Sequence, residues 1–189
     1  MDDEAGQVRQ EKLDPEREAR RRVALAQMRQ YGDPVLKMRA NEVEAFDGEL
    51  ASLVERMKAL MQDANGVGLA ANQVGVLRRV LVMRPDDEEP IVLVNPVVSE
   101  PSDEACTDDE GCLSLQGVTM PVERRLRLTV EGVDENGTEV RYELEGLAAR
   151  VLQHEVDHLD GVLILERTTD EARRAALAVL RPRITIAPS

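Results

Sequence analysis

The sequence has few aromatic residues, since its 189 residues include no Trp, one Phe and two Tyr. Aliphatic side chains and Met must therefore fill the core, and with 42% hydrophobic residues the chain can bury a sizeable one. Long apolar runs are also absent, because no stretch reaches the roughly 18 residues of a transmembrane helix. The acidic N-terminus lacks the apolar segment of a secretory signal, so we expect no contact with a membrane.

Cysteine is scarce as well, with Cys106 and Cys112 as the two examples. A disulfide framework would need more, which predicts a protein of the reducing cytoplasm. Basic residues are outnumbered, and the formal net charge is −13. Residues 84–116 contain ten acidic residues and one basic residue, a net charge of −9. We interpret this run as a solvated loop, and the charge argues against direct DNA binding, which needs basic patches.

The order of expected elements indicates the fold class. A helix that Asp47 caps precedes strands at 80–82 and 91–94, and alternating apolar residues around Asn136-Gly137 predict a β-hairpin. A helix at 147–159, a short strand at 162–165 and a helix at 170–180 follow. Because helices and strands do not alternate regularly, we predict an α+β fold with mostly antiparallel sheets. We divide the chain into an N-terminal extension (1–27), a domain (28–168) and a C-terminal helix and tail (169–189).

Two histidines one helical turn apart are the strongest functional signal. His154 and His158 are the only histidines of the chain, and they lie in the segment QHEVDH. Leu147, Val151 and both histidines share one helical stripe, so both imidazoles can reach one ion from the side that aliphatic residues bury. Glu155 lies about 100° round the helix from His154, where a carboxylate can move a proton next to a metal.

A catalytic site of this kind needs a third protein ligand. The third histidine of the long zinc-protease motif would stand at Ile164, so that version fails. Glu166 or Glu171 could serve in a general zinc protease. Cys112 could serve as a thiolate, with Gly111 letting the backbone approach the helix. Cys106 and Cys112 together with both histidines could instead close a structural zinc site.

Three segments together resemble the signature motifs of peptide deformylases. These segments are GVGLAANQ at 66–73, EGCLS at 110–114 and QHEVDH at 153–158. The likeness extends from about Tyr31 to Arg167. It implies a sheet-rich fold packed around a central HExxH helix, and an enzyme that removes the N-formyl group from the formylmethionine of new polypeptides.

The resemblance also implies a role for individual residues. Cys112, His154 and His158 would hold one divalent metal ion, ferrous iron in the cell, with zinc, nickel or cobalt as other occupants. Metal-bound hydroxide would attack the formyl carbon with Glu155 as general acid and base. The Gln73 side chain and the Leu113 backbone N–H would steady the oxyanion. The substrate-binding residues would be Gly66, Gly68, Glu110 and Gly111.

Some positions depart from the common pattern of the family. Asn72 replaces a frequent Pro, Leu115-Gln116 replaces a branched residue and Pro, and Ile164 replaces a frequent Phe. We expect these changes to alter the substrate groove and leave the chemistry intact. The implied partners are nascent polypeptide N-termini. Two interpretations stay open for the arginines at 173, 174, 181 and 183, namely contact with the ribosome and a solvated helix. The weak net charge of this region favours the solvated helix.

Overall fold

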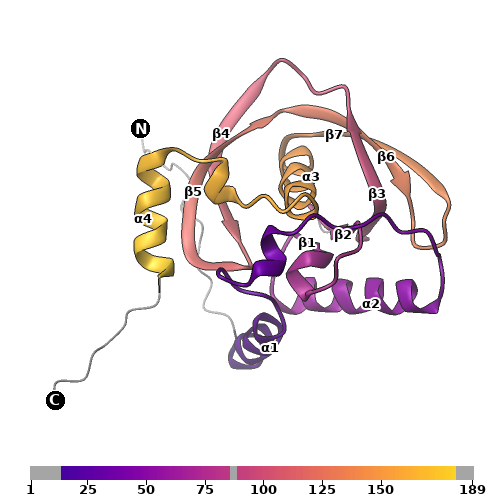
Figure 1. Ribbon diagram of the computed structural model, residues 1–189, viewed down its shortest axis with the longest axis horizontal. Helices are drawn as coiled ribbons and strands as arrows, with labels where there is room; N and C mark the ends of the chain where they lie inside the picture. The colour runs from indigo at the N-terminus through magenta and orange to yellow at the C-terminus, as the bar shows by residue number, and fades with distance from the viewer. Residues whose placement is uncertain (1–13, 86–88, 182–189) are drawn as a thin grey trace.

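The computed structural model describes residues 14–85 and 89–181 of the chain (Figure 1). The helices are α1 (Pro15–Ala26), α2 (Gly48–Asp63), α3 (Gly146–Leu159) and α4 (Asp170–Leu180), with short 3-10 turns at Pro34–Lys37, Ala71–Val74 and Ile164–Glu166. The strands are β1 (Gly68–Ala70), β2 (Val80–Met83), β3 (Ile91–Ser99), β4 (Ala105–Cys112), β5 (Leu115–Arg125), β6 (Arg127–Val133) and β7 (Glu139–Glu145).

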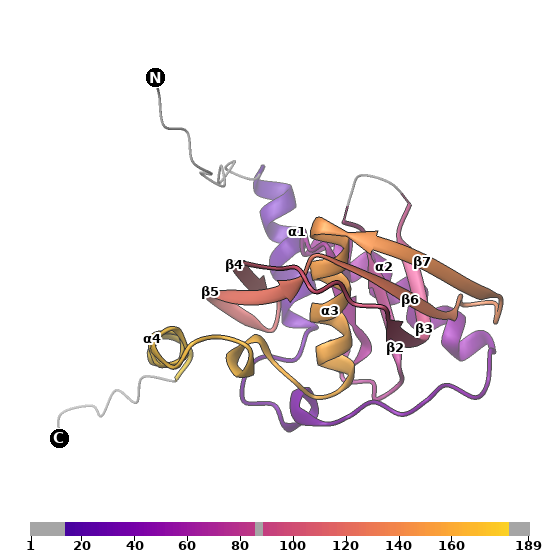
Figure 2. The same cartoon turned by 90° about the horizontal axis from the view of Figure 1, so that it is seen from above.

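The strands form two antiparallel sheets around helix α3. Five strands pair in the order β1-β2-β3-β6-β7, and β4 pairs with β5 in a separate hairpin. Figures 1 and 2 show α3 between the β4–β5 hairpin and the larger sheet. The predicted α+β class with mostly antiparallel sheets around this helix is confirmed.

The larger sheet carries a hydrophobic core on each face, because the apolar side chains of its inner strand β2 point alternately to the two faces. Val80 and Val82 of β2 belong to the core cluster that includes the buried face of α2. Leu81 and Met83 of the same strand join the cluster that includes Leu152 of α3. Successive side chains of a strand point to opposite faces, so the sheet is held between the two helices. This packing fixes α3 against the edge strand β1.

Local signals set several element ends as predicted. The Asp47 carboxylate accepts hydrogen bonds from the N–H groups of Glu49 and Leu50 and begins α2. Asp134 accepts bonds from the N–H groups of Asn136 and Thr138 in the turn of the β6–β7 hairpin, where Gly137 has φ +82°. The predicted helices at 147–159 and 170–180 are confirmed as α3 and α4.

Two predictions are wrong. Residues 162–165 form no strand, since Ile164–Glu166 is a 3-10 turn that a hydrogen bond from the Leu163 N–H to the Glu166 carboxylate closes. The acidic run is not a solvated loop, because its described residues include β3 and β4. Residues 105–109 of β4 are exposed, whereas Glu110 is 6% exposed. A strand that is polar on both faces lacks the alternation by which a sequence reveals a strand.

The described parts of the two flanking segments of the predicted division, residues 14–27 and 169–181, both pack on the fold. Ala24 and Leu25 of α1 are buried in the α2 core, and Ala176 of α4 is buried beside Val122 of β5. The boundaries at 27/28 and 168/169 stay predictions, and residues 1–13 and 182–189 lie outside the described residues. Among the described helices, none combines the length and apolarity that crossing a membrane requires.

Candidate metal centre

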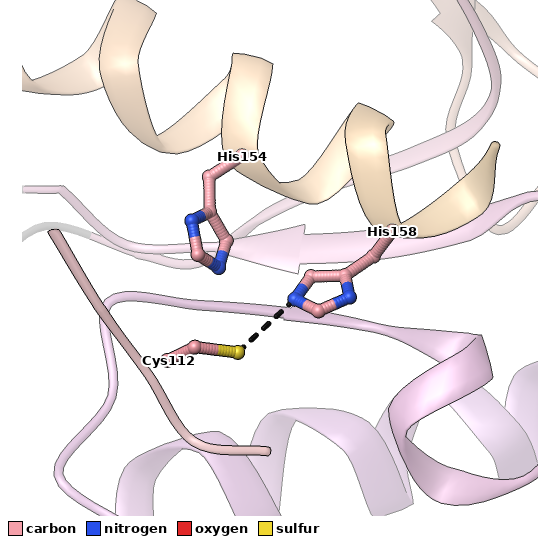
Figure 3. A group of neighbouring side chains, drawn as sticks. All are labelled: Cys112, His154 and His158. Carbon is pink, nitrogen blue, oxygen red and sulfur yellow. Dashed lines mark hydrogen bonds between the residues drawn. The ribbon is translucent and has the colours of Figure 1, made fainter. Parts of the chain in front are cut away.

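Three predicted ligands meet where the end of β4 faces α3 (Figure 3). The ligand atoms of Cys112, His154 and His158 all lie within 4.8 Å of one another. Cys112 Sγ is 3.2 Å from His158 Nε2, and both histidines point from successive turns of one helix toward the thiol. One thiolate and two imidazoles form a donor set that suits zinc and several other divalent transition metals.

The hydrogen bonds of the two rings fit a metal ligand set. His154 Nδ1 is 3.0 Å from Glu110 Oε2, which leaves Nε2 of this ring for an ion. His158 Nδ1 is buried without a partner among the described residues. Burial lowers the pKa of His158 well below its usual value, and the charges of His154 and Arg124 lower it further. His158 is therefore held as the neutral imidazole, which is the form that binds a metal. Burial also opposes a charge on His154, but hydrogen bonds to Cys112 and Glu110 outweigh it and raise the pKa of His154 well above its usual value, so this ring must lose a proton when it binds an ion.

Glu155 lies beside this group and is buried, so it is not a solvated helix residue. Its side chain is 3% exposed, and Oε2 has no partner within the described part of the chain. Burial raises the pKa of Glu155 to about 7, with the charge of His154 opposing this shift and that of Glu110 adding to it. A Cβ added at Gly68 would lie 2.9 Å from Glu155 Cδ, so only glycine lets β1 approach this closely.

Gln73 is held in a fixed orientation next to the thiol. Its Oε1 accepts a hydrogen bond of 2.9 Å from the Ala70 N–H. Its Nε2 therefore points the other way, 3.2 Å from Ser114 Oγ and 3.7 Å from Cys112 Sγ. Leu113 follows Cys112 directly in the turn between β4 and β5. Both residues line the same cavity as the metal group.

The cavity beside the metal group has a volume of about 610 Å³. Its walls include all of the predicted site residues except the buried His158, namely Gly66, Gly68, Gln73, Glu110, Gly111, Cys112, Leu113, His154 and Glu155. One wall is β1, which is the edge strand of the larger sheet. The end of β4 also lines the cavity, so an extended chain bound there could pair with the backbone of both strands.

The four residues that depart from the family pattern lie in different places in the structure. Leu115 and Gln116 line the cavity. Asn72 and Ile164 are buried elsewhere, with the Asn72 amide donating to the Met38 carbonyl at 2.7 Å, so the expectation that these two shape the groove is wrong. A Cβ at Gly111 would have no contact closer than 3.7 Å. Contacts within the chain therefore do not require a glycine there, although Gly111 lines the cavity.

The rival third ligands lie apart from the histidines. Glu166 bonds the Leu163 N–H at 2.7 Å and pairs with Lys37 at 2.8 Å. Glu171 is exposed in the first turn of α4. Cys106 is also exposed, six residues before Cys112 on β4, which is roughly 20 Å of extended chain. None of the three joins the potential metal group found among the described residues.

Sequence reasoning missed a buried ion network behind the histidines. Arg124 of β5 donates to both oxygens of Glu110, at 2.9 and 3.0 Å, and to Asp157 of α3 at 2.6 Å. Arg150 also donates to Glu110, at 2.8 Å. Burial raises the pKa of Glu110, but bonds from His154 and Arg124 and the Arg124 charge outweigh it and lower the value to about 2. No motif connects these segments, so only the folded chain reveals the network.

Comparison with known proteins agrees with this geometry. The family model described as polypeptide deformylase matches residues 25–174. The chain belongs to the polypeptide deformylase family. Deformylases are metal-dependent hydrolases that remove the N-formyl group from nascent peptides. The resemblance read from the three motifs is thus confirmed.

Individual deformylases are similar over most of the chain. Peptide deformylase 1 of Corynebacterium glutamicum is 44% identical over 162 residues, which cover 84% of this chain and 96% of that protein. The peptide deformylase of Thermodesulfovibrio yellowstonii is 43% identical over 149 residues, covering 77% and 90%. The crystal structure of the deformylase from Thermotoga maritima has a TM-score of 0.73 at 44% identity, covering 75% of this chain and 96% of that one.

Proposed function

We propose that this chain removes the formyl group from the N-terminal formylmethionine of new polypeptides, with Cys112, His154 and His158 holding one divalent metal ion. The observation that carries the proposal is the meeting of these three ligand atoms within 4.8 Å beside the buried Glu155. An ion held there would supply a Lewis acid that activates water and polarises the formyl oxygen.

We propose Glu155 as the residue that moves protons. It follows a ligand in the helix and lines the cavity in which the formyl group would lie. Its Oε2 has no partner among the described residues, so this oxygen is available to accept a proton from water and to pass it to the leaving amine. Burial excludes bulk water, which keeps the transferred proton in the site.

Gln73 and Leu113 would stabilise the negative charge that develops on the formyl oxygen. The bond from the Ala70 N–H fixes Oε1 of Gln73, so its Nε2 donor is already oriented before substrate binds. The Leu113 N–H would provide the second donor from the turn after Cys112. Fixed donors need no reorganisation during the reaction, which is why such pairs lower the barrier.

The polypeptide would bind as an additional strand along β1. Gly66 and Gly68 would present backbone on one side, and Glu110 and Gly111 would present it on the other. Leu113, Leu147 and Val151 also line the cavity and would offer apolar contacts to the methionine side chain.

For the bound ion we propose ferrous iron in the cell, as the resemblance to deformylases implies. Zinc, nickel and cobalt suit the same ligands. We further propose that the enzyme acts in the cytoplasm, on polypeptides as they emerge from the ribosome. Metal analysis of protein purified without oxygen would identify the ion.

The test is a metal count combined with an assay on formylmethionyl peptides. We expect about one ion per chain and release of formate, with acetylmethionyl peptides reacting far more slowly, because the extra methyl group must fit beside Gly66 and Gly68. Similar kcat/KM values for both peptides would indicate a general amidase. A metal-loaded protein that is inactive on both would indicate a structural metal site.

A further inference from the structure

Helix α1, which precedes the segments that carry the family motifs, contributes to the active-site cavity. Arg21 and Leu25 line that cavity next to Asn65 and Gly66. Arg21 and Asn65 also line a second, smaller cavity of about 190 Å³. We call this second cavity the arginine pocket, and its walls include Arg17, Arg20, Arg21, Arg84, Asp63 and Asn65. The two cavities are therefore neighbours that share part of one wall.

The arginine pocket is positively charged in an otherwise acidic chain. Among the described residues of its walls, four arginines and one aspartate give a net charge of +3, whereas the chain as a whole carries −13. Within residues 14–85 and 89–181, no ion pair includes Arg17, Arg20, Arg21 or Arg84. Like charges gathered around one cavity repel each other, and an anionic group in that cavity would relieve the repulsion.

The pocket lies on the path proposed for the polypeptide. Glu155 is packed against Gly68, so the formyl end of a substrate lies at that point of β1. A strand paired with β1 would run from there past Gly66 toward Asn65, where the pocket begins. At about 3.3 Å per residue, the third to fifth residues of the polypeptide would reach the pocket. Arg84 borders the same stretch, since its N–H donates to the Val67 carbonyl at 2.8 Å.

We propose that the arginine pocket binds acidic side chains at the third to fifth positions of the polypeptide, so that this enzyme prefers N-termini with Asp or Glu there. The proposal rests on the deformylase function proposed above. It makes Arg17, Arg20, Arg21 and Arg84 specificity-determining residues, and it gives α1 a role in substrate choice.

A peptide carboxylate fits the site better than a nucleic-acid phosphate does. The positive charge is confined to a small cavity that adjoins the substrate groove, whereas binding of RNA or DNA uses an extended basic surface. The active-site cavity beside it is also lined by Asp109, which is exposed, so its walls are of mixed charge and do not form one continuous basic surface. A single acidic side chain of a peptide, in contrast to a nucleic acid, needs only one small basic pocket.

The experiment compares two amidated peptides, formyl-Met-Ala-Glu-Glu-Ser and formyl-Met-Ala-Gln-Gln-Ser, on the full-length metal-loaded enzyme. We expect a preference for the Glu peptide of roughly three- to tenfold in kcat/KM, the size of a few partly exposed ion pairs. The gain should lie in KM, because the contact is equally strong in the ground state and the transition state. Added salt should reduce the preference for the Glu peptide.

Variants test whether the preference for the Glu peptide arises in the arginine pocket. The double variant Arg17→Gln/Arg20→Gln should lose most of the preference. Arg22→Gln should keep it, because Arg22 is exposed on the same helix and lines neither cavity. Equal kcat/KM values for both peptides in the wild type would overturn the proposal while leaving the deformylase function in place. A wild type that releases formate from neither peptide would instead contradict the deformylase function.

A second measurement covers the nucleic-acid alternative. A labelled single-stranded RNA is titrated with wild type and with the double variant. Binding that the double variant loses, combined with an unchanged preference between the two peptides, would overturn the proposal in favour of a phosphate site. RNA binding that is weak and equal in both proteins, combined with the lost peptide preference, would support the carboxylate site.

Discussion

Gly68 of β1 lies so close to Glu155 of α3 that no side chain fits between them. A Cβ added at Gly68 would come within 2.9 Å of both Cγ and Cδ of Glu155. Glu155 is buried, so its carboxylate can move away from β1 only into the cavity that it lines or by displacing packed groups. The edge strand that would pair with substrate therefore also fixes the position of the proposed proton carrier.

Gly68→Ala should displace the Glu155 carboxylate and lower kcat by about 10²-fold, the usual cost of moving a catalytic group by roughly 1 Å. Metal content should stay near one ion per chain, because the three atoms nearest to the new methyl group all belong to Glu155, which is not one of the three ligands. Gly48→Ala is the matched control, since nothing lies within 4 Å of a Cβ at Gly48. Steady-state kinetics on a formylmethionyl peptide decide the matter, and equal kcat values for both variants would contradict the positioning role of Gly68.

The two cysteines offer a direct test of the metal ligands. Cys112→Ser should lose most of its metal and activity, because a hydroxyl is a far weaker ligand than a thiolate. Cys106→Ser should keep both, since Cys106 is exposed and lies outside the ligand group. Atomic absorption on freshly purified protein gives the answer. Loss of metal from the Cys106 variant would favour a closed structural site instead.

Glu110→Gln should weaken metal binding without removing a ligand. The Glu110 carboxylate orients His154 through Nδ1 and neutralises Arg124 in a buried pair whose side chains are each 5% exposed. Loss of such an outer partner typically costs 10–100-fold in metal affinity. Breaking a buried ion pair costs about 3–5 kcal/mol of folding stability, and the loss here should be smaller because Arg124 keeps its bond to Asp157. Competition with a chelator and chemical unfolding measure the two effects.

Glu131→Gln is the control for this change, because Glu131 pairs with Arg141 on the exposed surface of the sheet. It should leave metal affinity unchanged. If Glu110→Gln bound metal as tightly as this control, the bond from His154 to Glu110 would have no part in preparing the site.

The sequence predicted those parts of the fold that depend on neighbours along the chain. The α2 helix follows from the Asp47 cap and an apolar stripe, and the two histidines share one helix, so their spacing alone brings them together. Strand β4 could not be recognised in this way. Five of its residues in a row are exposed, and its conformation depends on pairing with β5.

The environment of the site was equally hidden in the sequence. Glu110 is buried because Arg124 comes from the paired strand and Arg150 from α3, three segments that no local pattern connects. Arg21 lies in the segment that we assigned from the sequence to an N-terminal extension (1–27), yet it lines the active-site cavity. Such contacts arise from the tertiary fold, whereas the metal ligands were recognisable from residue type and spacing.

Glu155→Gln tests the proposed mechanism most directly. The replacement keeps the size and shape of a buried side chain that is 3% exposed, but an amide cannot accept a proton from water. The variant should fold and retain its metal, because Glu155 is not among the three clustered ligands. Its kcat should fall by roughly 10²–10⁴, the usual contribution of a positioned acid and base, with little change in KM. In free-energy terms this is about 3–5 kcal/mol of transition-state stabilisation. Metal occupancy and kcat are measured on the same preparation, since a ligand role would lower both together. A near-wild-type rate at full occupancy would show that proton transfer runs through another group.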